Sequence, residues 1–329
     1  MRILYLGTPE IAVAPLEMLH AAGHEIVGVV TQPDRPAGRK RVLTPPPVKV
    51  AAERLGLLVL QPDTLKDAAD VEQLRSLAPD IGVVAAYGEI LRRNVLDIPP
   101  LGYLNIHPSI LPLHRGPAPV VGAMLAGDDL IGVSIIRLTA KMDAGPILAQ
   151  STMRLPPTAR AGELTSALMR QGGELLRQVL PPYSQGQITP HAQDDSAATY
   201  TKMLTKADGE IDWRLPAIVI ERMIRAYDPW PGASTSANGQ PLKISSARVV
   251  AGWRGDEPPG SVVQESGVGS RRSGVGDQIL ASSPQPLAPH LLIATGSGAL
   301  ELREVQPAGK RVMSADEWWR GVRDVARLG

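Results

Sequence analysis

The stretch "GYLNIHPSILPLHRGPAP" (residues 102–119) begins as an apolar strand and continues as a proline-rich loop. Side chains alternate along an extended chain, so we expect Asn105 and His107 on one side of the strand and Ile106 on the other. Pro108 lacks an N–H group and disfavours helix at the residue before it, so the strand should end at His107. The sequence predicts a strand with an amide and an imidazole at its carboxyl end.

The chain before this stretch alternates apolar, β-rich runs with helical patterns. Such alternation indicates a parallel sheet, and continuously apolar runs suit strands that are covered on both faces. The expected strands are 2–7, 25–31, 57–61 and 80–87. Ligands of such sheets bind beyond the carboxyl ends of the strands, so Asn105 and His107 should face a binding site.

The sequence changes character after the first half. Residues 187–205 are polar and rich in turn formers, which predicts a linker, and the later segments are short, alternating and punctuated by glycine. We therefore expect an α/β protein, with a Rossmann-like domain over 1–186 and a smaller OB-like β-barrel domain over 206–329. Residues 266–288, rich in glycine and serine, should be an insertion in the second domain.

The amino-acid composition limits which classes of protein and which kinds of site are possible. The 329 residues carry 34 basic and 33 acidic side chains and no cysteine, so thiol nucleophiles and disulfides are excluded. The start of the chain does not have the pattern of a signal peptide, and no apolar run approaches the roughly 20 residues that span a bilayer. We expect a monomeric, cytoplasmic protein with no membrane partner. With a net charge of +1, a nucleic-acid partner would need a local basic patch.

A carboxylate could complete the chemistry of the strand end. An imidazole transfers protons near neutral pH, and an asparagine amide can donate to a developing oxyanion. Asp143 follows the expected strand 131–138 in a glycine-bounded turn, where it would orient the ring of His107 and favour its protonated form. Asn105, His107 and Asp143 together suit acyl transfer, although a loop histidine with satisfied hydrogen bonds and a turn-forming aspartate remain the alternative.

Other catalytic classes are disfavoured. No G-x-S-x-G elbow is present, and His107 and His114 are seven residues apart on a loop instead of four apart on a helix. A covalent hydrolase and a zinc site are therefore not expected, and we predict no metal.

The stretch 105–119, followed by "MDAGPIL" (142–148), resembles the folate-dependent formyltransferases. The resemblance implies 10-formyltetrahydrofolate as co-substrate, an oxyanion held by Asn105 and His107, and a charged His107 supported by Asp143. It also implies folate contacts from Ser109, Ile110, Leu111 and Pro112. "AYGEIL" (86–91) resembles the pterin-binding segment of the family, which would act largely through the backbone of Gly88, Glu89, Ile90 and Leu91.

Four further stretches resemble the branch of this family whose acceptor is the methionine of initiator Met-tRNA. They are "GTPEIAVAPL" (7–16), "TQPDRPAGRKRVLTPPPVK" (31–49), "RAYDPWPGA" (225–233) and "VQPAGKRVM" (305–313). Ile11 and Tyr227 depart from the family pattern, because phenylalanine is usual at both positions. The resemblance implies formylation of the α-amino group of methionine for translation initiation.

The charges of these stretches agree with a tRNA acceptor. Pro9 and Glu10 do not suit a phosphate-binding loop, which disfavours a small phosphorylated acceptor. We expect tRNA contacts from Arg35, Arg39, Lys40, Arg41, Lys310 and Arg311. A solvated basic turn is the alternative for the first four. Trp230 is expected to be buried near the domain junction.

Two other functions stay open. One is a related enzyme that also uses 10-formyltetrahydrofolate but formylates an amino-sugar nucleotide or hydrolyses the donor. The other is a non-catalytic tRNA-binding protein, against which the three polar residues argue, because binding alone does not require them.

Overall fold

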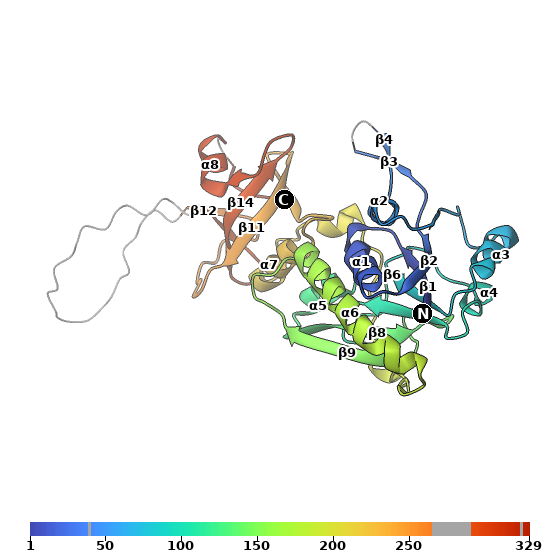
Figure 1. Cartoon of the computed structure of the whole chain (residues 1–329). Coiled ribbons are helices and arrows are strands. Elements are labelled where there is room, and N and C mark those ends of the chain that lie inside the picture. The colour runs from blue at the N-terminus through green and yellow to red at the C-terminus, as the bar shows by residue number, and fades with distance from the viewer. Residues whose placement is uncertain (39–40, 265–290, 323–324) are drawn as a thin grey trace, which may run out of the picture. The chain divides into compact units, whose positions relative to one another are not determined.

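The computed structural model describes residues 1–38, 41–264, 291–322 and 325–329. The chain divides into two compact units, residues 1–203 and 204–329, and Figure 1 labels many of their elements. The expected limits of 1–186 for the first domain, 187–205 for the linker and 206–329 for the second domain remain a prediction. The insertion expected at 266–288 lies outside the described residues.

A seven-stranded sheet forms the centre of the first unit. Its order is β5-β2-β1-β6-β7-β8-β9, and the first five strands are parallel, as the sequence predicts. The last two strands are antiparallel, and β9 was not expected. The strands are β1 (Arg2–Gly7), β2 (Glu25–Val30), β5 (Val59–Leu60), β6 (Ile81–Ala85), β7 (Tyr103–His107), β8 (Leu130–Arg137) and β9 (Ile147–Arg154).

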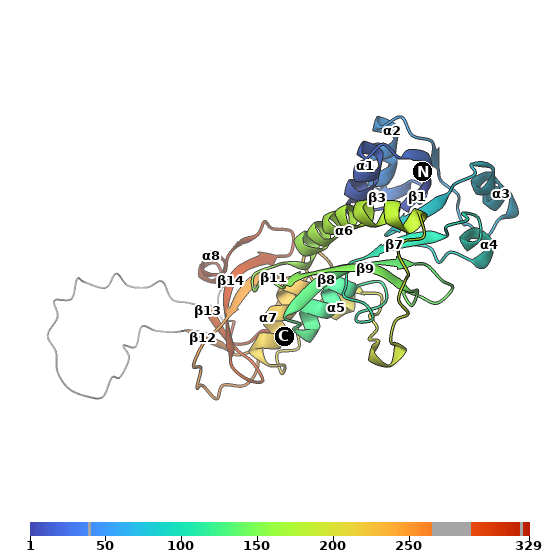
Figure 2. The same cartoon turned by 60° about the horizontal axis from the view of Figure 1, so that its bottom comes forward.

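Helices cover both faces of this sheet. They are α1 (Val13–Ala21), α2 (Pro47–Arg54), α3 (Ala68–Ser76), α4 (Arg93–Leu96), α5 (Pro119–Ala126) and α6 (Ala161–Ser184), with short 3-10 turns at Glu10–Ala12 and Asp195–Ala197. The longest helix, α6, packs on β7, β8, β9 and α1, as Figure 2 shows. In the described part of the chain, no helix is both long and apolar enough to cross a membrane.

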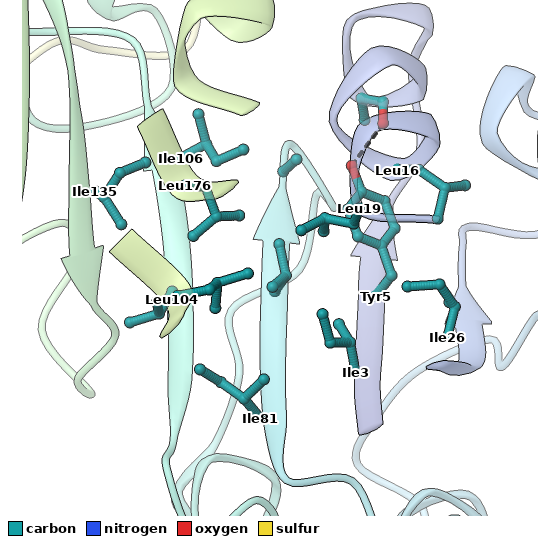
Figure 3. Close-up of a cluster of buried hydrophobic side chains, with 14 of the residues drawn as sticks. Ile3, Tyr5, Leu16, Leu19, Ile26, Ile81, Leu104, Ile106, Ile135 and Leu176 are labelled. Carbon is teal, nitrogen blue, oxygen red and sulfur yellow. Dashed lines mark hydrogen bonds between the residues drawn. The ribbon is translucent and has the colours of Figure 1, made fainter. Parts of the chain in front are cut away.

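The alternation of β1 sends its side chains into two separate cores. Ile3 and Tyr5 pack with residues of α1, α2 and α6, and Figure 3 shows this core with the Tyr5 hydroxyl donating to the Ala12 carbonyl oxygen. Leu4 and Leu6 join the opposite core, which includes residues of α3 and α4. A strand that is apolar at successive positions is therefore buried on both faces, as expected.

The basic loop after β2 forms a small hairpin. Its strands, β3 (Arg35–Ala37) and β4 (Val42–Thr44), pair antiparallel. Arg39 and Lys40 lie outside the described residues.

The second unit is an antiparallel β structure with two helices and a 3-10 turn, Lys206–Gly209, in its described part, which confirms the class predicted for it. The sheet order is β10-β11-β14-β13-β12, and β15 pairs with β14. The elements are α7 (Ala217–Ala226), β10 (Ser234–Ala237), β11 (Gln240–Val249), β12 (Val262–Gln264), β13 (Leu291–Ala294), β14 (Ala299–Pro307), β15 (Met313–Ser314) and α8 (Ala315–Arg320). Isolated bridges join Leu328 to Ala237 of β10 and Arg327 to Ser261, which precedes β12.

Candidate active site

Strand β7 positions the amide and the imidazole as its alternation predicts. Leu104 and Ile106 enter the core beneath α6, so Asn105 and His107 face the opposite side of the sheet. His107 is the last residue of the strand, pairs with Ser134 of β8, and is only 4% exposed. The two polar side chains therefore share one side of the sheet at its carboxyl end.

The turn after β8 brings the carboxylate to this place. Oδ1 of Asp143 lies 3.7 Å from Nδ1 of His107, a close contact longer than a hydrogen bond. Oδ2 of Asp143 accepts a hydrogen bond of 2.8 Å from the backbone N–H of Gly116. Asp143 has a φ of 49°, in the left-handed region that aspartate adopts more readily than most residues. Residues 36 positions apart in the sequence thus meet at one site.

The hydrogen-bond partner of His107 determines which ring nitrogen carries the hydrogen. Nε2 lies 3.1 Å from the carbonyl oxygen of His114, and a carbonyl only accepts, so Nε2 carries the hydrogen. Burial lowers the pKa of His107 below its ordinary value, and the nearby His114 ring lowers it further, while the Asp143 charge and the His114 carbonyl raise it. The sequence predicts a charged ring, but burial outweighs the carboxylate. Nδ1 is the ring nitrogen that faces Asp143.

A small cavity adjoins this group. Its volume is about 140 Å³, and Asn105 and Asp143 line it together with Glu89, Ile90 and Leu91. The remaining lining is Val84, Leu96, Leu138, Thr139, Ala140, Lys141 and Met142. Apolar side chains and a few polar groups thus line it together, as is typical of a small-molecule site. Three of the four residues expected at the pterin are thereby brought beside the catalytic candidates.

Gly88, the fourth, lines a neighbouring cavity of about 580 Å³. Thr8, Gln32 and Ala86, which follow β1, β2 and β6, also line it, so it opens at the carboxyl ends of three parallel strands. Arg35 borders the same space, and its guanidinium donates to Gln32 at 3.0 Å.

The segment Ser109–Pro112 does not line the cavity beside Asn105. Ser109 and Leu111 are buried, the Ser109 hydroxyl donates to the Leu113 carbonyl oxygen, and the Leu111 N–H donates to the Ser134 hydroxyl. These bonds fix the loop that follows His107. Folate contacts from Ser109, Ile110, Leu111 and Pro112 remain a prediction.

The other basic candidates are solvent-accessible. Arg41 is exposed on the β3–β4 hairpin, and Arg311 pairs with Glu317 at 2.7 Å. Lys310 borders a hollow of about 420 Å³ in the second unit, beside Trp318. The prediction that Trp230 is buried is wrong, because its side chain is 55% exposed. Pro229 and Pro231 restrict the backbone around Trp230, but the local sequence does not determine whether its ring is buried.

Sequence reasoning missed two residues that contact this site. The side chain of Gln193 donates to the backbone carbonyl oxygens of Asp143 and Gly145, and it accepts from Arg115, which is 1% exposed. A charged residue inside a proline-rich loop was a signal for Arg115. Gln193 lies in the expected linker, which is rich in polar residues, so its residue type did not distinguish it from its neighbours.

Comparison with known proteins agrees with the geometry. The family model described as formyl transferase matches residues 1–180, and the formyl transferase C-terminal domain matches residues 203–323. A methionyl-tRNA formyltransferase from Herpetosiphon aurantiacus is 65% identical over 328 residues, and one from Chloroflexus aurantiacus is 61% identical over 330 residues. Both alignments cover 100% of each chain.

A solved structure shares the fold. The N-formyltransferase from Helicobacter canadensis, in complex with folinic acid and dTDP-3-aminofucose, has a TM-score of 0.64 at 15% identity. The match covers 94% of this chain and 100% of the other. The family models and the two relatives place this chain, over its whole length, in the formyl transferase family, among the methionyl-tRNA formyltransferases.

Proposed function

We propose that this protein transfers the formyl group of 10-formyltetrahydrofolate to the α-amino group of methionine on initiator Met-tRNA. The products are formylmethionyl-tRNA, for translation initiation, and tetrahydrofolate. The observation that carries the proposal is the placement of Asn105 and Asp143 on one cavity at the carboxyl end of β7, with Nδ1 of His107 3.7 Å from Asp143. The names of the two relatives that match the whole chain support the same acceptor.

The chain provides a proton acceptor for the attacking amine. An α-amino group with a pKa of about 7.7 to 8.0 is partly neutral at neutral pH, and it must lose a proton once its bond to the formyl carbon forms. Nδ1 of neutral His107 can take this proton, because Nε2 already donates to the His114 carbonyl oxygen. Asp143, at 3.7 Å, then stabilises the imidazolium, which can return the proton to the departing nitrogen.

The negative oxygen needs a donor that is already in place. Asn105 lines the cavity, and its backbone is held in strand β7, which places its side chain beside the site. A preorganised donor of this kind stabilises developing charge more strongly than water, because it does not have to reorient.

The folate would supply the formyl carbon, and Glu89, Ile90 and Leu91 would hold its ring. Ile90 is 74% exposed and Met142 is 52% exposed, so both could cover a flat ligand at the rim. The Glu89 carboxylate is held by the Thr64 hydroxyl at 2.7 Å and the Leu65 N–H at 3.2 Å. Gly88 and the loop Ser109–Pro112 complete the predicted folate contacts.

For the acceptor we propose contacts from both units. In the first unit they are Arg35, Arg39, Lys40 and Arg41, and in the second they are Lys310 and Arg311. The second unit would act as an OB-like barrel: its chain end bridges strand β10 on one edge and Ser261 beside β12 on the other, which supports closure of the sheet. We expect the protein to act as a monomer.

One experiment tests reaction and acceptor together. Purified protein is mixed with 10-formyltetrahydrofolate and Met-tRNA, the tRNA is deacylated, and N-formylmethionine is measured. Parallel reactions with an amino-sugar nucleotide or with no acceptor test the related enzymes. Formylation of the sugar, or release of formate without formylmethionine, would overturn the proposed acceptor.

A charge reversal tests the basic hairpin. Replacing Arg39, Lys40 and Arg41 by glutamate should raise the KM for Met-tRNA strongly and leave the affinity for folate unchanged. Unchanged turnover of Met-tRNA at low concentration would contradict the tRNA contacts, and binding without any turnover in the parent protein would favour a non-catalytic role.

A further inference from the structure

A buried guanidinium lies directly behind the active-site loop. Arg115 is 1% exposed, and its Nε and Nη2 donate to the side-chain oxygen of Gln193 at 3.0 and 2.8 Å. Nη2 also donates to Asp195 at 2.7 Å, and Nη1 donates to the Tyr200 hydroxyl at 3.1 Å. A buried charge with this many partners has one orientation, so Arg115 is a rigid attachment point.

Gln193 is attached to the opposite loop at its other end. Its Nε2 donates to the carbonyl oxygens of Asp143 at 2.8 Å and Gly145 at 2.7 Å. The side-chain amide of Gln193 therefore donates twice to the turn that carries Asp143, and its oxygen accepts from Arg115. This amide joins two loops that the sequence separates by 27 residues or more.

The residues on either side of Arg115 contact the catalytic candidates. The carbonyl oxygen of His114 accepts from His107, and the N–H of Gly116 donates to Asp143. Movement of Arg115 would therefore displace a partner of the ring and a partner of the carboxylate at once. Gln193 bridges the two loops in addition to the direct bond from the Gly116 N–H to Asp143, and the contact of 3.7 Å between His107 and Asp143 lies next to this bridge.

We propose that Gln193 and Arg115 are positioning residues, which hold the Asp143 turn against His107 through a single bridging amide. Neither residue lines the cavity beside Asn105, so each acts through another residue and not on the substrate. The effect on turnover rests on the proposed function, whereas the effect on the His107 ring does not.

The test is Gln193→Met, which keeps the length of the side chain and removes both ends of the bridge. Arg115 keeps Asp195 and Tyr200, so its charge stays paired. We expect kcat for formyl transfer to fall about 10- to 100-fold with KM for both substrates within about twofold, because a misplacement of about 1 Å can cost 10²-fold. The matched control is Gln171→Met, which loses one side-chain bond of 2.6 Å to Ser151, away from the site.

The second readout is the pKa of His107, measured by NMR titration of histidine-labelled protein without substrates. The Asp143 charge raises this pKa and the His114 ring lowers it, so loosening the Asp143 turn should lower it further. A lower pKa in Gln193→Met but not in Gln171→Met supports the proposal even if the parent protein has no formyl-transfer activity. An unchanged pKa, or a kcat equal to that of Gln171→Met, would overturn it. If Gln193→Met does not fold, Gln193→Glu, which keeps the acceptor for Arg115 and loses the donor to Asp143, is measured for kcat by the same criterion.

Discussion

Replacing Gly116 by alanine should reduce activity far more than its effect on stability explains. Gly116 has a φ of +108°, and its N–H holds Oδ2 of Asp143 at 2.8 Å. A Cβ atom at this position would lie 2.6 Å from the carbonyl oxygen of Thr201, whereas ordinary contact begins at 3.4 Å. The peptide would have to move by about 0.8 Å, the difference between these two distances.

The magnitudes follow from this geometry. A left-handed alanine costs about 1–2 kcal/mol, and forcing an extra carbon into a packed site costs about 1–3 kcal/mol, so the free energy of unfolding should fall by roughly 2–5 kcal/mol. The same shift moves the N–H that holds Asp143 and, through His114, the partner of His107. A misplacement approaching 1 Å predicts a loss of about 10²-fold in kcat.

The assay is steady-state formylation of Met-tRNA, run well below the melting temperature of the variant, with denaturant unfolding measured in parallel. Gly186→Ala is the control, because Gly186 has a φ of +70° and no other atom lies within 4 Å of the added carbon. It should lose about 1–2 kcal/mol of unfolding free energy and no activity. If Gly116→Ala unfolds more easily but retains a kcat within threefold of Gly186→Ala, the role assigned to the loop is refuted.

Three further outcomes are expected. Asn105→Ala should lower kcat by about 10²–10³-fold with folate affinity largely kept, measured by fluorescence titration, and an equal loss of folate affinity would contradict the oxyanion role. Asp143→Asn should lower the pKa of His107, because the carboxylate raises it, so the acidic limb of the kcat–pH profile moves to lower pH while its plateau falls. Tyr5→Phe removes a buried hydrogen bond to Ala12 and should reduce the free energy of unfolding by about 0.5–1.5 kcal/mol without changing kcat.

Local patterns predicted much of this protein. The two-residue period of β7 determined that Asn105 and His107 share a side, and Pro108 determined where that strand ends. The apolar runs predicted β1, β2, β5 and β6 and their parallel direction. The alternating strand β9 was not predicted, because it carries polar residues at alternate positions and follows a proline. The alternation of side chains also could not predict that β8 runs antiparallel, because a strand has the same two-residue period in both directions.

The tertiary structure decided what depends on neighbours distant in the chain. The exposure of Trp230 and the bridging role of Gln193 depend on which surfaces meet, and no local period carries this information. The charge of His107 is the clearest case: the sequence supplied the carboxylate that favours the cation, and folding supplied the burial that opposes it and prevails. Residue types and their spacing determined which chemical groups are present, but the dielectric around them and their final distances exist only once the chain has packed.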